Sequence, residues 1–365
     1  MKIECIKNKI KEPVSIIEKI TGKNLALPIL SAILLVVKNK ILTLRATNLD
    51  LGIEIEIPVK THSDGIAAVP GSIFNNLLSN LHDEIVVIES ENENIILKTK
   101  NSSTVLKSYP YDDFPTLPAI TKEESFVVQG KKFIEGLKSV WFSASYSDIK
   151  PEISSVYMFQ DSNFLVFVST DSFRLAEKKV NIQGKEKISS FLIPIKNISE
   201  LIRIFNDTNE NITISFNKNQ VCFKSNGIYV VSRLVDGIFP DYKQIIPKDF
   251  VSEAIVLKQD FLNALKLTNL FSDKLNQIGI KINPSKKLFE LHSKNPDIGE
   301  NVVQIGAALS GNSLELNFNY KYIIECLQSI PKDSLSLQFG GENKPLVIQG
   351  VGDKFFTYLV MPLNQ

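Results

Sequence analysis

The chain repeats one short pattern three times along its 365 residues. The copies are LRATNLDL at residues 44–51, VSTDSFRL at 168–175 and, more faintly, LHSKNPDI at 291–298. Thr47 lies 123 residues before Thr170, which in turn lies 124 residues before Lys294. A period of this length indicates an array of similar domains, and this constrains the fold more than any other feature of the sequence.

Further markers keep the same period. Strand ends lead into amphipathic helical patterns 124 and 125 residues apart, at Val69-Pro70, Ile193-Pro194 and Phe318-Asn319. Similar helical patterns open at residues 10–14, 133–137 and 261–265, and Phe114-Pro115 recurs 125 residues later as Phe239-Pro240. Any alternating α/β protein shows some self-similarity, but several markers at one period are hard to obtain by chance. We therefore expect three domains, at residues 1–122, 123–248 and 249–365.

Each copy predicts two helices and many strands. In the first copy, helical periodicity covers residues 7–20 and 71–80, and alternation predicts strands at 42–46, 53–59, 85–89, 95–99 and 104–108. The helices are too few for an array of βαβ units, so the sheets should be antiparallel. The expected fold class is α+β, with three similar domains that each pack two helices on antiparallel sheets.

The charges are unevenly distributed although 41 basic and 40 acidic residues leave a net charge of +1. The six expected helices with their flanks hold 15 basic and 7 acidic residues, against 26 and 33 in the remainder. Helices grouped on one face would present a diffuse positive surface that suits phosphate backbones without reading sequence. Lysine is also simply a good helix former, so charge alone does not decide between these interpretations. Fourteen of these basic residues would form the positive surface: Lys7, Lys9, Lys11, Lys19, Lys23, Lys131, Lys132, Lys138, Lys196, Arg203, Lys258, Lys266, Lys274 and Lys321.

No motif indicates catalysis, a metal or a cofactor. The three cysteines and three histidines lack metal-ligand spacing, and neither a nucleophile elbow nor a phosphate loop is present. Asp112-Asp113 and Asp161 could pair as carboxylates, but acidic turn residues are common. The start of the chain lacks the apolar core of a signal peptide, and the longest apolar run, residues 26–37, is well below the roughly 20 residues of a membrane helix. We expect a cytoplasmic, non-enzymatic protein.

One long motif carries a family resemblance. Residues 234–242, LVDGIFPDY, resemble the signature of the bacterial DNA sliding clamps, the beta subunits of DNA polymerase III. Supporting matches follow in the family's order, as LPIL at 27–30, TDSFRL at 170–175 and YLVMPL at 358–363. The resemblance spreads over the whole chain.

This resemblance implies a head-to-tail homodimer of three-domain subunits, closed into a ring whose helices line the hole. Such a ring encircles duplex DNA and raises polymerase processivity by topology, because a tethered enzyme stays at high effective concentration. The implied partners are duplex DNA, a second copy of the chain, the replicative polymerase, the clamp loader and other proteins with a clamp-binding motif.

The family binds peptides of glutamine-leucine-x-leucine-phenylalanine type in a cleft between its second and third domains. Position by position, the matching residues are Ile153, Thr170, Ser172, Arg174, Leu175, Pro240, Ile245, Leu359, Val360, Met361, Pro362 and Leu363, with Asn319 and Tyr322 at the polar edge. Plain structural interpretations also exist: the apolar members could be core, the proline and tail residues turn packing, and the arginine the partner of a nearby acid.

The chain departs from the family at the rim of this cleft. Ser172-Phe173 replaces glycine-histidine, Ile238 stands where a polar or basic residue is common, Gln244 replaces arginine, and the tail lacks its arginine. The rim is therefore less basic, and peptide preference should shift.

The resemblance also assigns the ring interface and the DNA-contacting loops. At the interface, Leu77 and Leu81 of one subunit would meet Leu270 and Phe271 of the other, although all four could be core residues of their own domains. For DNA, Lys23, Asn24 and Lys150 occupy matching loop positions.

Three other functions stay open. A DNA-binding protein that grips duplex from one side would stay on DNA with free ends, whereas a ring would slide off. A protein-binding repeat scaffold would be monomeric, without salt-dependent DNA contact. A hydrolase or transferase would need the catalytic motifs that the sequence lacks.

Overall fold

The computed structural model describes the chain except for residues 23–26, 119, 121–123, 148, 183–187 and 364–365. The described residues form six α-helices and 26 β-strands, and their paired strands are all antiparallel. They divide into two compact units. The first unit contains residues 1–131 and 199–234, and the second contains residues 132–198 and 235–365.

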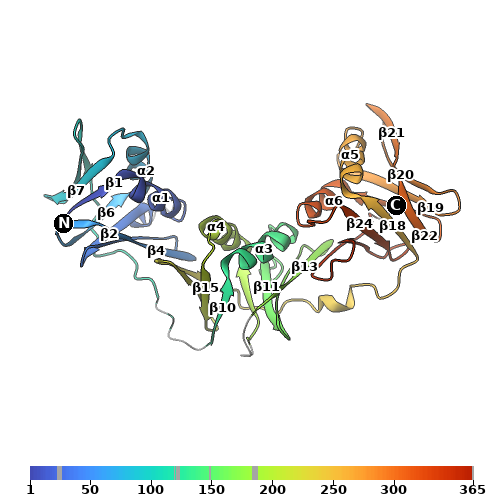
Figure 1. Cartoon of the computed structure of the whole chain (residues 1–365), viewed down its shortest axis with the longest axis horizontal. Coiled ribbons are helices and arrows are strands. Elements are labelled where there is room, and N and C mark those ends of the chain that lie inside the picture. The colour runs from blue at the N-terminus through green and yellow to red at the C-terminus, as the bar shows by residue number, and fades with distance from the viewer. Residues whose placement is uncertain (23–26, 119, 121–123, 148, 183–187, 364–365) are drawn as a thin grey trace. The chain divides into compact units, whose positions relative to one another are not determined.

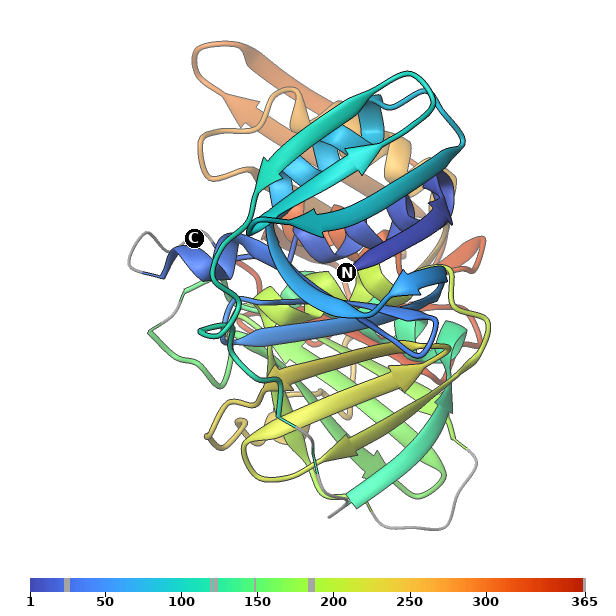
Figure 2. The same ribbon diagram turned by 90° about the vertical axis from the view of Figure 1, so that its left-hand side faces the viewer.

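Two sheets build the first unit. The five-stranded sheet follows the order β5 (Lys60–Ser63), β1 (Lys2–Ile6), β7 (Ile85–Glu91), β8 (Asn94–Lys98) and β9 (Ser103–Lys107). The eight-stranded sheet follows the order β10 (Glu124–Gln129), β15 (Asn211–Phe216), β16 (Gln220–Ser225), β17 (Ile228–Arg233), β4 (Leu51–Pro58), β3 (Ile41–Thr47), β2 (Ala32–Lys38) and β6 (Gly65–Pro70). In Figure 2 the blue strands β2 to β4 continue into the olive strands of residues 211–233.

Helices α1 (Lys7–Glu18) and α2 (Gly71–Asn80) lie side by side in this unit (Figure 1). Ile10, Val14 and Ile17 recur every three to four residues on α1 and are fully buried. Phe74 and Leu78 form the equivalent buried stripe on α2. This spacing buries one face of each helix against the core and leaves the polar face in solvent.

The second unit also contains two sheets. The nine-stranded sheet runs β14 (Phe191–Pro194), β11 (Ser155–Asp161), β12 (Phe164–Thr170), β13 (Arg174–Asn181), β26 (Phe356–Val360), β25 (Leu346–Gly350), β24 (Ser334–Phe339), β18 (Ser252–Leu257) and β22 (Ala307–Gly311). The four-stranded sheet runs β21 (Gly299–Gln304), β20 (Leu288–Asn295), β19 (Gln277–Asn283) and β23 (Leu314–Asn319).

Helices α5 (Lys258–Asn269) and α6 (Tyr320–Leu327) pack together in the second unit (Figure 1). The two central helices, α3 (Gly130–Val140) and α4 (Ile195–Phe205), each have residues in both units. A Cβ at Gly136 on α3 would come within 2.5 Å of the Phe167 ring, so the packing requires glycine at this position. The same ring lies 5.9 Å from the ring of Phe133, so it fills the space beside the helix.

The repeat seen in the sequence is a repeated hairpin. The first copy spans the turn between β3 and β4, the second the turn between β12 and β13, and the third the turn between β20 and β21. The predicted transitions from strand to helix are confirmed, since β6 leads directly into α2, β14 into α4, and β23 into α6. Each copy therefore has two helices, as predicted.

The predictions for the first copy differ from the structure in detail. The first helix ends at Glu18 rather than at residue 20, while the second has the predicted bounds. All five predicted strands are present within two residues of their expected ends, but β1, β2 and β5 were not predicted. Strand β2 is AILLVVK, whose residues are buried on both faces, so it lacks the alternation that marks a strand.

The compact units do not follow the boundaries predicted at residues 122 and 248. Each large sheet takes strands from both sides of one boundary, with β4 pairing β17 and β13 pairing β26. The three-domain division at these residues stays a prediction. No helix among the described residues is long and apolar enough to span a membrane.

Candidate partner-binding site

The site begins at the tight turn between β12 and β13. The Thr170 hydroxyl donates to the carbonyl of Arg174 at 2.6 Å and accepts from the backbone N–H of Ser172 at 3.1 Å. Asp171 Oδ1 accepts from the N–H groups of Phe173 and Arg174, each at 3.0 Å. Short side chains that bond to nearby backbone groups favour such turns over continued strand.

Ser172 has a φ of +79°, in the left-handed region. Glycine adopts this conformation without steric cost, whereas the Cβ of serine makes it less favourable. In this chain the serine is exposed and is followed by Phe173, whose side chain is 60% exposed.

Arg174 follows the turn and is buried, with 6% of its surface exposed. Its Nε donates to Asp171 Oδ2 at 2.9 Å, and its Nη1 donates to Glu325. The guanidinium carbon also lies 4.4 Å from the ring centre of Tyr322 and 5.8 Å from that of Phe142. Burial acts to lower the pKa of Arg174, but the surrounding acidic groups outweigh it and raise the pKa, so the side chain stays charged.

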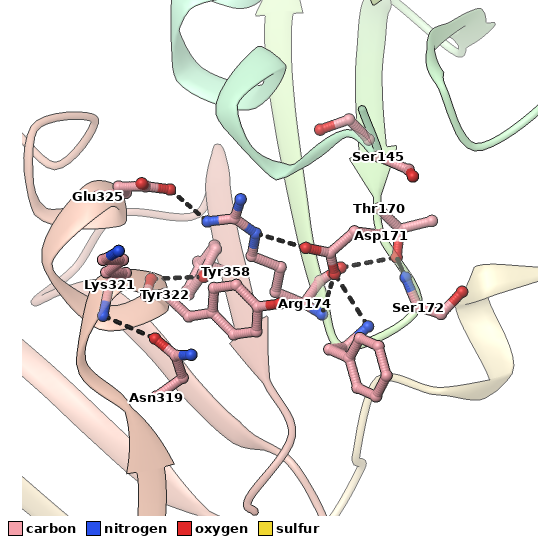
Figure 3. A network of polar contacts seen from close by, with 12 residues as sticks. Ser145, Thr170, Asp171, Ser172, Arg174, Asn319, Lys321, Tyr322, Glu325 and Tyr358 are labelled. Carbon is pink, nitrogen blue, oxygen red and sulfur yellow. Dashed lines mark hydrogen bonds and ion pairs between the residues drawn. The ribbon is translucent and has the colours of Figure 1, made fainter. Parts of the chain in front are cut away.

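Helix α6 supplies the opposite side of this network (Figure 3). Asn319 caps the helix, since its side chain accepts from the Lys321 N–H at 2.9 Å. The fully buried Tyr358 donates its hydroxyl to the carbonyl of Tyr322 at 2.6 Å. Burial raises the pKa of both tyrosines, which therefore stay neutral at physiological pH and remain able to donate.

The end of the chain runs past both sides of the network. The Met361 N–H donates to the carbonyl of Phe173, and the Leu363 N–H donates to the carbonyl of Asn317 on β23, each at 2.8 Å. Met361, Pro362 and Leu363 are half-buried. The tail thus lies between the turn and the edge of the four-stranded sheet.

Two aromatic residues of the LVDGIFPDY motif pack on the nine-stranded sheet. Phe239 stacks on Tyr157 with ring centres 4.9 Å apart and meets Tyr242 edge-on at 6.2 Å. The Tyr242 hydroxyl donates to the carboxylate of Glu177. These aromatic rings pack in one core cluster of the second unit, made of Val166, Val168, Leu175, Leu192, Phe239, Tyr242, Val347 and Leu359.

The predicted cleft residues fall into four groups. Thr170, Ser172, Arg174, Asn319 and Tyr322 belong to the turn and to the N-terminal end of α6. The buried members are Ile153, Leu175, Leu359 and Val360, and the tail supplies Met361, Pro362 and Leu363. Pro240 and Ile245 are exposed on the segment that carries the motif, where Ile238 is 91% exposed.

Sequence reasoning missed four members of this network. Asp171 lies inside the repeated pattern, and its place in a short turn next to Thr170 could have indicated its role. Tyr358 lies in the YLVMPL match, but its contact with α6 was not predicted. Phe142 and Glu325 gave no signal, and Arg174 reaches Glu325 across 151 residues of sequence.

The expected DNA-facing residues differ in their exposure. Lys132, Lys138, Lys150, Lys196, Lys266 and Lys321 are exposed, and Lys11 is half-buried. Lys7 donates to the carbonyl of Leu81 at 2.9 Å, and Arg203 contacts both Glu200 and the carbonyl of Ile16. Lys23 and Asn24 lie outside the described residues.

The four residues expected at the ring interface are also only partly buried. Leu270 is 65% exposed, while Leu77, Leu81 and Phe271 are half-buried. The Phe271 ring lies 3.8 Å from the position that a Cβ would take at Gly299, so it packs beside the first residue of β21.

The described residues contain no group of three or more His, Cys, Asp or Glu side chains arranged to hold a metal ion. The three cysteines are buried thiols, and burial raises the pKa of Cys5 to about 11. Thiols in such surroundings are poor nucleophiles.

Comparison with known proteins matches nearly the whole chain. Models of the DNA polymerase III beta subunit match residues 1–118 with its N-terminal domain, 127–241 with its central domain and 243–364 with its C-terminal domain. The beta sliding clamp of Staphylococcus epidermidis is 28% identical over 348 residues, which cover 93% of this chain and 92% of that protein. The beta sliding clamp of Staphylococcus aureus is 27% identical with the same coverage.

Solved structures agree. The DNA polymerase sliding clamp of Bacillus subtilis superposes with a TM-score of 0.96 at 26% identity, and the beta subunit of Thermotoga maritima with 0.94 at 26%, each covering 100% of this chain and 99% of the other. The expected class is therefore confirmed: three DNA-clamp domains of mixed helix and sheet. The chain belongs to the DNA polymerase III beta subunit family, whose members are sliding clamps that serve as non-catalytic processivity factors in DNA replication.

Proposed function

We propose that two copies of this chain join head to tail into a ring that encircles duplex DNA in the cytoplasm. The ring slides without reading sequence and tethers the replicative polymerase and other proteins through the network around Arg174, α6 and the tail. The clamp loader would open the ring. Each subunit would have three domains divided near residues 122 and 248, which is supported by family-model matches that adjoin near those positions.

The ring is supported by a difference in strand pairing among the three repeated hairpins. The second strand of the first hairpin, β4, pairs with β17, and that of the second, β13, pairs with β26. Within the described residues, the corresponding strand of the third hairpin, β21, ends its sheet, and so does β9. Pairing of β21 with β9 of a second copy would complete the series and remove both open edges.

The exposed side chains at these edges support such a contact. Ile298 and Val302 on the third hairpin are 63% and 62% exposed, and Leu270 at the end of α5 is 65% exposed. On β9, Val105 is 61% exposed. Apolar side chains concentrated at an open sheet edge are typical of an interaction surface.

The observed pairings also predict the register of this contact. Leu51 lies opposite Ser232 in the first pairing, and Arg174 lies opposite Val360 in the second. The repeat makes Ile298 the position equivalent to Arg174. The 125-residue spacing of Phe114 from Phe239 makes Lys107 the position equivalent to Ser232. We therefore place Ile298 opposite Lys107 and Gly299 opposite Leu106 of the partner chain.

The DNA contact is supported by the exposed lysines on the helices. Phosphate contacts of this kind give sequence-independent, salt-sensitive binding, which a sliding ring requires. The peptide site is supported by the turn, α6 and tail, which gather in one unit most of the residues that the resemblance assigns to the cleft.

Retention on DNA separates a ring from its alternatives. The protein is loaded by its cognate clamp loader onto nicked circular DNA, and bound protein is measured before and after a single cut linearises the circle. We expect loss on cutting, because a ring slides off free ends. Retention on the linear product would indicate a side-on DNA binder, and failure to load with no salt-dependent DNA contact would favour a protein scaffold.

A further inference from the structure

The buried Arg174 has two carboxylate partners of different origin. Asp171 lies three residues away in the same turn and has 14% of its side chain exposed. Glu325 lies on α6, 151 residues further along the chain, with 42% of its side chain exposed. The first pair fixes the guanidinium to its own turn. The second is therefore the ionic contact that ties this turn to helix α6.

Arg174 is placed poorly for direct contact with a partner's charge. It is 6% exposed, and its charge is balanced by two carboxylates. A buried guanidinium whose hydrogen bonds are satisfied and whose charge is paired gains little from a further ligand. Its position fits a support beneath the site better than a part of the binding surface.

Tyr322 lies on the same side of α6 as Glu325, one helical turn earlier. The Arg174 guanidinium carbon lies 4.4 Å from the centre of its ring, within the range of a cation–π contact. Figure 3 shows Arg174 between Asp171 and Glu325, with Tyr322 beside it. The salt bridge to Glu325 therefore holds the face of the helix that carries Tyr322.

We propose that Glu325 is a positioning residue for the partner-peptide site, which acts through Arg174 to fix Tyr322 at the polar edge. This inference rests on the proposed function of the site. Glu325 itself makes no contact with the peptide. Its removal leaves Arg174 paired with Asp171 alone, lets the N-terminal end of α6 shift, and weakens peptide binding without opening the ring.

The test measures the affinity of the full-length protein for a fluorescent peptide of glutamine-leucine-x-leucine-phenylalanine type by anisotropy. Glu325→Ala is expected to weaken binding about threefold to tenfold, in line with coupling energies inside side-chain networks. Gln328→Ala is the matched control, because Gln328 is an exposed residue at the C-terminal end of the same helix. The control should bind as the wild type does.

A double-mutant cycle separates positioning from a general structural effect. In a Tyr322→Ala background, Glu325→Ala should cause no further loss of affinity, because the residue through which it acts is absent. Full additivity of the two losses, or equal affinity of Glu325→Ala and Gln328→Ala, would overturn the inference. If the wild type itself fails to bind the peptide, the proposed function of the site is wrong instead.

Discussion

The turns at residues 47–51 and 170–174 have the same backbone design and different surroundings. Thr47 donates to the carbonyl of Leu51 at 3.0 Å and accepts from the N–H of Leu49, as Thr170 does with Arg174 and Ser172. Asn48 takes the place of Asp171 and also accepts from two backbone N–H groups. The middle residues have φ values of +77° and +79°.

The two turns differ in the residue that follows them. In the first unit this residue is Leu51, which is 1% exposed and packs in the core. A hollow of about 180 Å³ nearby is lined in part by Leu117, whose side chain leaves no room for a Cβ on Gly52. In the second unit the residue is Arg174, which binds Asp171 and Glu325. The two turns thus share one backbone structure. The residue that follows the turn packs in the core in the first unit, as Leu51, and connects the turn to helix α6 in the second, as Arg174.

The largest expected effect concerns the proposed interface beside the third hairpin, where Phe271, just after α5, packs next to Gly299. Leu270→Asp combined with Phe271→Asp should convert the dimer into soluble monomers of about 41 kDa, because charges would be buried at the apolar interface. Sedimentation would report the mass. Peptide affinity should be retained, and a double variant that stays dimeric would contradict the proposed interface.

Removal of residues 361–365 should abolish peptide binding without opening the ring. The deletion removes the backbone bonds from Met361 to Phe173 and from Leu363 to Asn317, so one side of the second turn is uncovered. Anisotropy with the labelled peptide measures the loss, and sedimentation checks the dimer. Unchanged affinity would show that the tail is no part of the site.

Replacing the two threonines tests whether the turns are equivalent. Thr47→Val and Thr170→Val each remove a buried hydroxyl that makes two backbone bonds, so each should lower the free energy of unfolding by about 1–3 kcal/mol. Chemical denaturation provides the measurement. Only Thr170→Val should also weaken peptide binding, and an equal effect of Thr47→Val on peptide affinity would break the functional comparison.

The smallest effect is expected at the left-handed residues. Ser172→Gly should raise the free energy of unfolding by about 0.5–1 kcal/mol, because glycine adopts a positive φ without steric cost. Thermal unfolding of Ser172→Gly beside Leu49→Gly measures it. A gain at one position and a loss at the other would mean that the two turns are strained differently.

The sequence predicted those features of the fold that depend on local pattern. The helices α1 and α2 and the strand ends that lead into helices follow from residues close together in the chain, and three similar patterns about 124 residues apart predicted the repeat. The surroundings of Arg174 do not follow from such patterns, since Glu325 lies on α6, 151 residues further along the chain, and Tyr358 lies on β26, which pairs with β13. Phe239 and Tyr242 were recognised as a signature, but only the structure shows that their rings pack on the sheet.

The sharing of sheets between successive repeats has a consequence for how the molecule comes apart. A fragment that ends at residue 122 would lack β17, and the backbone donors and acceptors of β4 would be exposed along one side. Such a fragment should self-associate, because an unpaired strand carrying Ile53, Ile55 and Ile57 is a template for another chain. Cooperative loss of structure should therefore follow the two compact units, with hydrogen exchange in β4 and β17 rising together rather than repeat by repeat.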